Sequence, residues 1–384
     1  MQKSNRKKVA LYIPNLSCGG SGGAETYGIG IAEALSGNYD ITIYARANKV
    51  LKSDISDIYT KLNTKKYTTR FIHLVSIGPK HPRLRLIANI QLIFVRKEIE
   101  KNYDLFINCT QGELMGCNNI PSIHIVHFPD IPAERIFPKL IGRVLDRNYL
   151  NSYELFLANS EFTKKWFEKY WLKECSILNP PSRICSQEDI KWEEKENIIL
   201  AVSRIVPDKK VMEMIIAFKK LVDTYHCNYR FVIIGNSSSK YAKYANQITE
   251  SIGDYPIEIY SNVLQNDLLE WYKRAKVFWH AKGLGVDNSD PFDMEHFGMT
   301  TVEAMSYGCV PVVINRGGQV EIVDDGCVGR RWNTIDELIV MTNEIINNEE
   351  IMKIYSENAI KKSNKYQMQC FKRNLCHFVH EVLK

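Results

Sequence analysis

The chain has 384 residues, of which 45% are hydrophobic and 24% charged, so it is long enough for two domains and has a globular rather than a disordered composition. The formal net charge of +6 favours anionic partners, such as phosphate-bearing small molecules or an anionic membrane surface, and no arginine-rich run indicates nucleic acid. The ten cysteines show no C-x-x-C pair or zinc-ligand spacing, and no apolar run approaches the ~20 residues of a membrane span. We therefore expect a cytoplasmic protein with reduced thiols.

The first half of the chain predicts a parallel α/β sheet. An apolar run at 8–16 leads into a glycine-rich loop at 17–26, a helical stretch at 27–37 and a strand at 40–45. This strand–loop–helix–strand order is typical of parallel sheets. Further strands are predicted at 70–75, 104–109, 122–127 and 155–159, and a helix at 82–101.

The second half repeats the same pattern after a proline-marked, charged linker at 178–197. We expect a first Rossmann-like domain at 1–182 and a second at 183–365, with the tail at 334–384 helical. Ligands of such sheets bind at the carboxyl ends of the strands, in a crevice. The predicted segments are strands at 198–205, 230–236, 257–263 and 310–315, a helix at 209–225, and a helix that runs into a strand at 268–281.

The first glycine-rich loop contains "GGSGGAE" at 19–25. Such loops let backbone N–H groups approach a phosphate at a helix N-terminus. The loop does not fit a dinucleotide fingerprint, because Glu25 stands where the third glycine of a G-x-G-x-x-G starting at Gly20 belongs. A nicotinamide enzyme is therefore not expected, which leaves a phosphate or sugar approach loop or a plain flexible turn.

Charged and polar residues follow predicted strands in both halves. In "VSRIVPDKK", Arg204 ends a strand and Lys209 lies five residues on, so the two cations could clamp a diphosphate or be ordinary exposed residues at a turn. In "IHIVHFPD", His127 ends a strand and could face a cleft, where it would bind a sugar hydroxyl or move a proton. We expect His124 to be structural, and a structural role is also open for His127.

The stretch "DPFDMEHFGMTTVEAMSYG" contains two glutamates eight positions apart. Thr300 and Glu303 form a T-x-x-E pattern that predicts a capping box, and Gly308 is suited to end the helix. Glu295 precedes the helix, beside N–H groups that favour an anion, and suits neutral hydroxyls, with a solvated loop charge as the alternative. The aspartates of 287–293 also allow a magnesium site. A diphosphate beside two cations and a helix N-terminus, however, has no electrostatic need of a metal ion.

Together these motifs resemble the retaining glycosyltransferases of family 4. The resemblance implies an α/β protein of the GT-B fold, with two facing Rossmann-like domains and a deep interdomain cleft. Its most specific part is the E-x7-E pattern of Glu295 and Glu303, and "HFPD" at 127–130 resembles mannosyltransferases that act on lipid-linked oligosaccharides. Two departures are the serine in "VSRI", where the family commonly has glycine, and "GNSSS" in place of Gly-Asp/Glu-Gly. The stretches that carry the resemblance are "GGSGGAE", "HFPD", "SRIVPDKK", "VIIGN", "EHFGMTTVEAMSYGCVPVV" and "GGQVEIV".

The resemblance also implies roles for individual residues. Arg204 and Lys209 would stabilise the donor diphosphate, and Glu295 would bind hydroxyls of the donor sugar. His127 would face the reacting sugar and is the fourth catalytic candidate, beside Arg204, Lys209 and Glu295. Glu303 would hold the ribose. The last helix, near 366–384, would pack back onto the first domain. The other implied donor-binding residues are Gly22, Gly23, Asn262, Val263, Leu264, Gly298, Met299 and Thr300.

The function implied by the resemblance is transfer of a hexose-type sugar, such as mannose, in polysaccharide biosynthesis. The donor would be a GDP- or UDP-linked sugar and the acceptor a glycan or lipid-linked glycan, with retention of configuration and without metal or cofactor. A GT-B phosphorylase and a sugar-nucleotide epimerase are alternatives. A non-catalytic sugar-binding subunit is disfavoured because the candidate polar set is intact.

One segment suggests contact with a membrane. The stretch at 82–97 combines an apolar helical run with Arg83, Arg85, Arg96 and Lys97, so it could lie on an anionic membrane surface. The alternative is a core helix with charged ends. We therefore expect a cytoplasmic protein with a peripheral contact to the inner face of the membrane as one option.

Overall fold

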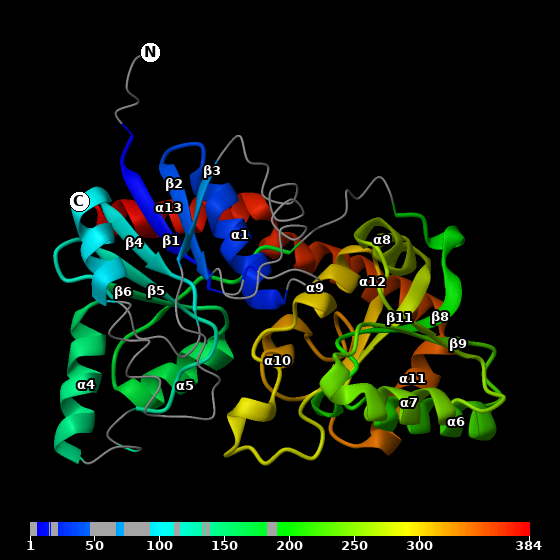
Figure 1. The fold of residues 1–384 in the computed structure, drawn as a ribbon. Coiled ribbons are helices and arrows are strands. Elements are labelled where there is room, and N and C mark those ends of the chain that lie inside the picture. The colour runs from blue at the N-terminus through cyan, green and yellow to red at the C-terminus, as the bar shows by residue number, and fades with distance from the viewer. Residues whose placement is uncertain are drawn as a thin grey trace. The chain divides into compact units, whose positions relative to one another are not determined.

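The computed structural model describes residues 6–14, 16, 22–46, 67–72, 93–110, 116–132, 135, 139–182 and 190–384. These residues belong to two compact units (Figure 1). Unit 1 consists of Met1–Pro181 together with Met368–Lys384, and unit 2 of Ser182–Gln367. Each unit contains one parallel sheet with helices, so the prediction of two Rossmann-like α/β domains is confirmed.

Unit 1 contains a seven-stranded sheet in the order β3-β2-β1-β4-β5-β6-β7, and every described strand pair in it is parallel. Residues 9–12 of β1 are fully buried, as expected for a central strand covered on both faces. The strand order reverses between β1 and β4, which makes this the switch point where ligands of such sheets bind. The strands are β1 (Lys8–Tyr12), β2 (Asp40–Arg46), β3 (Tyr67–Ile72), β4 (Leu105–Asn108), β5 (Ser122–Val126), β6 (Leu155–Ala158) and β7 (Ser176–Ile177).

The last helix of the chain packs on the first helix of unit 1. Phe371 and Leu375 lie one turn apart on α13 and join the same apolar cluster as Ile31 of α1. Gly30 permits the close approach of the chain to α1, because a Cβ at this position would lie 2.5 Å from Pro181. Figure 1 shows α13 in red beside α1 in blue. The helices of unit 1 are α1 (Gly23–Leu35), α4 (Lys139–Asn151), α5 (Glu161–Trp171) and α13 (Met368–Val382), and residues 93–102 are also helical.

Unit 2 contains a six-stranded sheet in the order β10-β9-β8-β11-β12-β13, again with parallel pairs throughout its described strands. The order reverses between β8 and β11, so the loops that follow these two strands flank the switch point of this unit. The strands are β8 (Glu196–Val202), β9 (Arg230–Ile234), β10 (Ile257–Tyr260), β11 (Ala275–His280), β12 (Val310–Ile314) and β13 (Arg330–Trp332).

Aromatic side chains fill the core of unit 2 between its sheet and helices. Trp279 of β11 packs against Phe231 of β9, with ring centroids 5.3 Å apart, and edge-on against Phe218 of α6 at 6.5 Å. Its indole N–H donates to the hydroxyl of Thr342 at 3.1 Å, so the one polar atom of this buried ring is satisfied. The helices are α6 (Val211–Tyr225), α7 (Ala242–Glu250), α8 (Gln265–Arg274), α9 (Met299–Ser306), α10 (Gln319–Ile322), α11 (Ile335–Ile346) and α12 (Glu349–Ser363), with short 3-10 turns η3 (Trp192–Glu194), η4 (Pro207–Lys209), η5 (Ser239–Tyr241), η6 (Pro291–Asp293) and η7 (Asn364–Tyr366).

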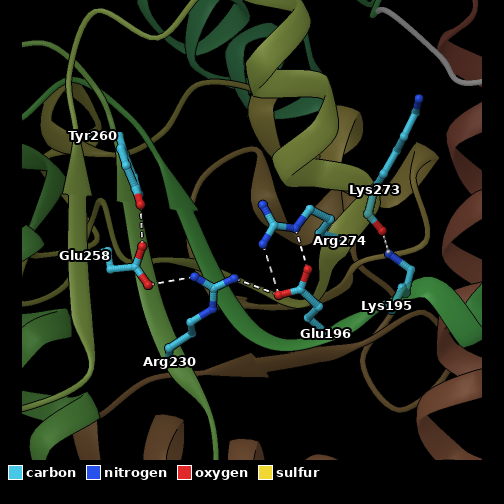
Figure 2. Close-up of polar contacts among 7 residues, drawn as sticks. All are labelled: Lys195, Glu196, Arg230, Glu258, Tyr260, Lys273 and Arg274. Carbon is cyan, nitrogen blue, oxygen red and sulfur yellow. Dashed lines mark hydrogen bonds and ion pairs between the residues drawn. The ribbon is translucent and has the colours of Figure 1, made fainter.

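A chain of ion pairs joins β8, β9 and β10 near their amino ends (Figure 2). Arg230 bridges Glu196 and Glu258, with an N–O distance of 2.7 Å to each. Arg274, at the end of α8, contacts the same Glu196 carboxylate at 2.5 Å, and the hydroxyl of Tyr260 donates to Glu258. These contacts lie at the end of the strands opposite to the one that binds ligands, so we assign them a structural role.

Lys195 adds a buried link to the same region. Its ammonium donates to the main-chain carbonyl of Ala275 at 2.7 Å and to that of Lys273 at 3.1 Å (the latter in Figure 2). The carbonyls at the C-terminus of a helix have no intrahelical donor, and a cation is favoured there. Lys195 therefore caps the end of α8.

The structure covers part of the segment predicted to meet a membrane. Residues 82–92 lie outside the described residues, whereas 93–97 are helical. Ile93 and Phe94 are 46% and 70% exposed, and Arg96 pairs with Glu100 at 3.2 Å. Within the described part of the chain, no helix has the length and apolar character needed to cross a membrane. Contact of the 82–97 segment with a membrane surface stays a prediction.

Candidate functional site

The two cations predicted to clamp a diphosphate, Arg204 and Lys209, follow β8 at the switch point of unit 2. The N–H of Ser203 donates to β9 at 3.0 Å and so continues the pairing of the two strands. Gly235 makes this path available, because a Cβ there would lie 1.6 Å from the carbonyl oxygen of Ser203. The chain then leaves the sheet, which places Arg204 in an exposed position and Lys209 in η4. Among the described residues, no hydrogen bond or ion pair forms on the Arg204 side chain.

Lys209 forms a compact ionic cluster with Glu295 and His280. Its Nζ lies 2.6 Å from Oε2 of Glu295, and Nε2 of His280 lies 3.2 Å from the same oxygen. The exposed fractions of the three side chains are 15%, 19% and 5%, respectively. His280 ends β11, so both strands of the switch point contribute to the cluster. Lys282 extends it, with Nζ 3.8 Å from the carboxylate of Asp208.

The protonation states in this cluster follow from burial and from the neighbouring charges. Burial alone would raise the pKa of the Glu295 carboxyl, but Lys209 and the hydrogen bond to His280 hold it well below its usual range. Burial lowers the pKa of His280, and Glu295 opposes that shift only in part. At neutral pH the carboxylate is therefore ionised and the imidazole neutral, with its Nε2–H donating. An ionised carboxylate only accepts hydrogen bonds, which suits it to sugar hydroxyls.

The helix that follows the cluster begins earlier than the sequence pattern predicts. The N-cap of α9 is Gly298, whose φ of 123° is one that L side chains rarely adopt. No side chain caps the helix, so the predicted capping box of Thr300 and Glu303 is wrong. Met299 is the first helical residue and Thr300 the second. Glu303 therefore lies beyond the first turn, where its carboxylate accepts a hydrogen bond from the hydroxyl of Tyr272 at 3.2 Å.

Glu295 lies outside α9, as predicted, in the chain between η6 and the helix. Its backbone is fixed by a loop distant in sequence, because the N–H of Gly318 donates to the carbonyl of Glu295 at 2.7 Å. A Cβ at Gly317 would lie 2.2 Å from the same oxygen, so the loop approaches closely only with glycine there. Gly308 follows the end of α9 with a φ of 72°, which confirms its predicted place at the helix end.

Asn262, Val263 and Leu264 form the turn that precedes α8. Asn262 has a φ of 56°, and its N–H donates to Oδ1 of Asn236 at 2.5 Å. Leu264 is the N-cap of α8 and is 72% exposed, whereas Val263 packs against the apolar cluster that contains part of α8. Asn236 follows β9 at the point where the sequence departs from Gly-Asp/Glu-Gly. Its side chain holds this turn in place.

In unit 1, the predicted glycines stand at the start of α1. Gly22 is the N-cap, and its carbonyl accepts a hydrogen bond from the N–H of Thr26 at 3.1 Å; Gly23 is the first helical residue. Residues 17–21 of the glycine-rich loop lie outside the described residues. The helix N-terminus therefore follows the loop directly after β1, as the phosphate-approach hypothesis requires.

His127 follows β5 in unit 1 and is 8% exposed. Its ring packs edge-on against Tyr27 of α1 at 5.6 Å, and Nε2 lies 3.3 Å from Sγ of Cys109. Burial lowers the pKa of His127 to about 4 and raises that of the Cys109 thiol, so neither group is charged at neutral pH. A neutral thiol is a poor nucleophile, and the pair therefore does not form a thiolate–imidazolium dyad.

His124 has a structural role, as predicted. Its Nδ1 lies 2.7 Å from the hydroxyl of Tyr149, and its Nε2 lies 3.3 Å from the carbonyl oxygen of Thr110. The ring is 4% exposed and also stacks on Tyr153 at 5.1 Å. Both nitrogens and one ring face are thus occupied by the protein itself.

Three residues of the ionic cluster were not predicted from the sequence, namely His280, Lys282 and Asp208. The signal that could have revealed two of them is "VFWHAK", which ends the predicted strand at 268–281 next to the switch point. In the part of the chain that the structure describes, there is no group of three or more His, Cys, Asp or Glu side chains placed to hold a metal ion.

Comparison with known proteins gives independent evidence about the family of the chain. Residues 183–362 match the family described as Glycosyl transferases group 1. The alpha-monoglucosyldiacylglycerol synthase of Acholeplasma laidlawii is 25% identical over 340 residues, which cover 86% of this chain and 76% of that protein. The alpha-1,3/1,6-mannosyltransferase ALG2 of Saccharomyces cerevisiae is 25% identical over 291 residues, which cover 64% of this chain and 56% of that protein.

Solved structures share the fold over nearly the whole chain. Anabaena Alr3699/HepE in complex with UDP and glucose aligns with a TM-score of 0.72 at 18% identity, covering 98% of this chain and 100% of that one. A glycosyltransferase from Rickettsia africae gives a TM-score of 0.74 at 16% identity, covering 99% of both chains. The predicted GT-B fold is thus confirmed. With its glycosyl transferases group 1 domain at 183–362, the chain is a glycosyltransferase.

Proposed function

We propose that the chain is a retaining, metal-independent glycosyltransferase that moves a hexose-type sugar from a nucleotide-diphosphate donor to a glycan or lipid-linked acceptor. The observation that carries this proposal is the cluster of Lys209, Glu295 and His280 at the switch point of unit 2, with Arg204 exposed at the same strand end. The names of two relatives, a glucosyl- and a mannosyltransferase, support a hexose.

The proposed roles follow from charge. Breaking the bond between a sugar and a diphosphate places negative charge on phosphate oxygens, and fixed cations stabilise that charge as it develops. Arg204 and Lys209 would supply those cations, and the first turn of α9, from Gly298 to Thr300, would add backbone N–H groups. Glu295 remains ionised, so it would accept hydrogen bonds from the sugar hydroxyls.

The remaining donor contacts are assigned by resemblance. Glu303 would bind the ribose, and its hydrogen bond from Tyr272 is consistent with this because a carboxylate can accept several donors. The turn at 262–264 would meet the base, which we take to be uracil or guanine. His127 and the glycines at the start of α1 would face the sugar and its acceptor. A clamp of two cations leaves the diphosphate without an electrostatic need of a metal ion, and no cofactor is proposed.

Donor identity is tested by thermal shift with UDP, GDP, ADP and their sugars, because a ligand that binds the native state raises its stability. A ligand at 100 times its Kd stabilises by about 2.7 kcal/mol, so a true donor should raise Tm by several degrees. We expect a response to UDP or GDP and none to ADP. Arg204→Ala should reduce the response, whereas Lys240→Ala, an exposed cation in η5, should not.

Transfer itself is tested with labelled donor and a lipid-linked or free glycan acceptor. Wild-type protein should give an acceptor-linked sugar of retained anomeric configuration, with the same yield in the presence of EDTA. Arg204→Ala and Lys209→Ala should each lower the rate by about 10²-fold or more, as for loss of a partner of transition-state charge. Donor isomerisation without transfer, or phosphorolysis, would replace the proposal with the alternative activities, and wild-type turnover in both variants would remove the diphosphate clamp.

A further inference from the structure

Helix α4 of unit 1 has an exposed apolar face. Leu140, Ile141, Val144 and Leu145 are 78%, 55%, 54% and 40% exposed. Positions i, i+1, i+4 and i+5 of a helix lie on one side, so the four side chains form a single strip. Single exposed apolar residues are common on proteins. Four large aliphatic side chains gathered on one exposed face, by contrast, indicate an interaction surface. Figure 1 shows α4 as an outer helix of unit 1.

A row of cations borders this strip. Lys139, Arg143 and Arg147 follow one another at intervals of four residues and are all exposed. By helical geometry the row lies alongside Leu140 and Val144. The opposite side of the helix is the buried one, with Gly142, Asp146 and Tyr149 against the unit. The only carboxylate in α4 thus lies on the buried side, 8% exposed, whereas the solvent side carries aliphatic and cationic groups.

We propose that the strip and the cation row of α4 form a surface that docks on an anionic lipid bilayer. Aliphatic side chains enter the boundary between headgroups and acyl chains, while long basic side chains reach the phosphates beside them. The two features therefore match the two layers of such a membrane surface, and the net charge of +6 favours approach to it.

The cation row decides between a bilayer and a second copy of the chain. A two-fold interface with the two α4 helices antiparallel would bring the cation rows of two copies together, and like charges at an interface are unfavourable. Apolar interfaces between proteins are also depleted of charge at their centre. An anionic bilayer complements both features, so it is the occupant to which the inference commits.

The surface adds a location to the proposed function but does not depend on it, because docking involves neither donor nor transfer. It also differs from the segment at 82–97. Substitutions in α4 should therefore lower vesicle binding whether or not Arg96 and Lys97 are neutralised.

The test is co-sedimentation of the full chain with vesicles of equal parts phosphatidylcholine and phosphatidylglycerol, and with vesicles of phosphatidylcholine alone. The wild type should pellet with the anionic vesicles. Leu140→Gln with Val144→Gln should lower the partition coefficient at least about tenfold. Lys139→Gln with Arg147→Gln should lower it about fivefold per cation, and added salt should reduce wild-type binding.

Matched controls use exposed side chains of unit 2. Ile351→Gln with Ile354→Gln changes two aliphatics of α12 that are 39% and 49% exposed, and Lys240→Gln with Lys243→Gln removes two exposed cations. Both should bind vesicles like the wild type. Circular dichroism melting establishes that each variant is folded.

The proposal is overturned if the wild type stays in the supernatant with anionic vesicles, or if the α4 variants pellet like the controls. It is also overturned if light scattering shows a wild-type dimer that becomes a monomer in the α4 aliphatic variant, because the strip is then a protein interface. Since no donor or acceptor is added, a failure of the transfer reaction does not affect this result.

Discussion

The ion pair between Lys209 and Glu295 gives the sharpest test of the site geometry. Lys209→Met keeps most of the length of the side chain and removes its charge, and Glu295→Gln keeps the shape of the carboxylate and removes its charge. The two changes and their combination form a double-mutant cycle on a contact of 2.6 Å. The cycle isolates the pair from the neighbouring contacts, of which the hydrogen bond from His280 is the nearest.

The magnitude follows from the burial of the pair. Removing one partner of a buried pair typically costs about 3–5 kcal/mol, because the other charge stays buried alone. Here the side chains are 15% and 19% exposed, and His280 remains beside the carboxylate, so we expect Lys209→Met to cost about 2–3 kcal/mol. Glu295→Gln should cost a similar amount, because it leaves the charge of Lys209 without its partner. The double variant should cost no more than either single variant, since it leaves no lone charge, which gives a coupling energy of about 2 kcal/mol.

The assay is hydrogen exchange of the β11 amides, which reports the opening of unit 2 separately from unit 1. In the wild type the pair should stay ionised at both pH 7 and pH 5. A carboxyl with a depressed pKa contributes stability above its unfolded pKa of about 4.3 and loses it only as the pH falls through the lower folded value. A coupling below about 0.5 kcal/mol at pH 7 would refute the buried ion pair.

Three further changes test other parts of the structure. Gly298→Ala places a Cβ 2.4 Å from the Gln319 amide at a φ of 123°, so thermal unfolding should show a cost about 1–3 kcal/mol above that of Gly285→Ala, whose Cβ would meet nothing within 4 Å at a φ of 74°. Equal costs would contradict this packing. Lys195→Met removes the donor to the carbonyls that end α8 and should lower the free energy of urea unfolding by about 1–3 kcal/mol; unchanged stability would argue against that cap. Lowering the pH from 7 to 5 should destabilise unit 1, because the folded pKa of His124 is about 4 whereas the unfolded chain takes up a proton near 6.5. This residue accounts for about 2 kcal/mol at pH 5, and an equal pH response in His124→Gln, measured by urea unfolding, would exclude it as the cause.

Much of the fold could be predicted from local pattern. Continuous apolar runs mark strands buried on both faces, and both sheets appear where those runs stand, as at 40–45 and 230–236. The helix that runs into a strand at 268–281 is found as α8 and β11. The short edge strands β7 and β13 and the helix α4 were not foreseen. Two or three residues carry no periodicity, and the exposed aliphatics of α4 disturb the usual amphipathic pattern.

The site was predicted only as far as local sequence determines it. Glu295 stands outside its helix because the helix begins only after the Phe297-Gly298 pair, with Gly298 as its N-cap. The T-x-x-E pattern failed because the packing of Gly317 and Gly318 against 295–297 sets the start of α9, and no local pattern contains that contact. His280 was not predicted for the same reason, because the order of the strands brings its partner Glu295 to it.

The geometry separates the two cations that the sequence pattern treats as a pair. Lys209 already has a carboxylate at 2.6 Å, so part of its charge is compensated before any donor binds. Arg204 is exposed at the strand end, and no carboxylate among the described residues pairs with it. Its guanidinium also has a fork of donors suited to phosphate. In the proposed reaction, a diphosphate would therefore gain more from Arg204 on approach. It would gain from Lys209 only as far as Glu295 transfers its hydrogen bonding to a sugar hydroxyl. The carboxylate would thus couple recognition of the sugar to the availability of a cation for the leaving group, and a nucleotide without its sugar would lack that coupling.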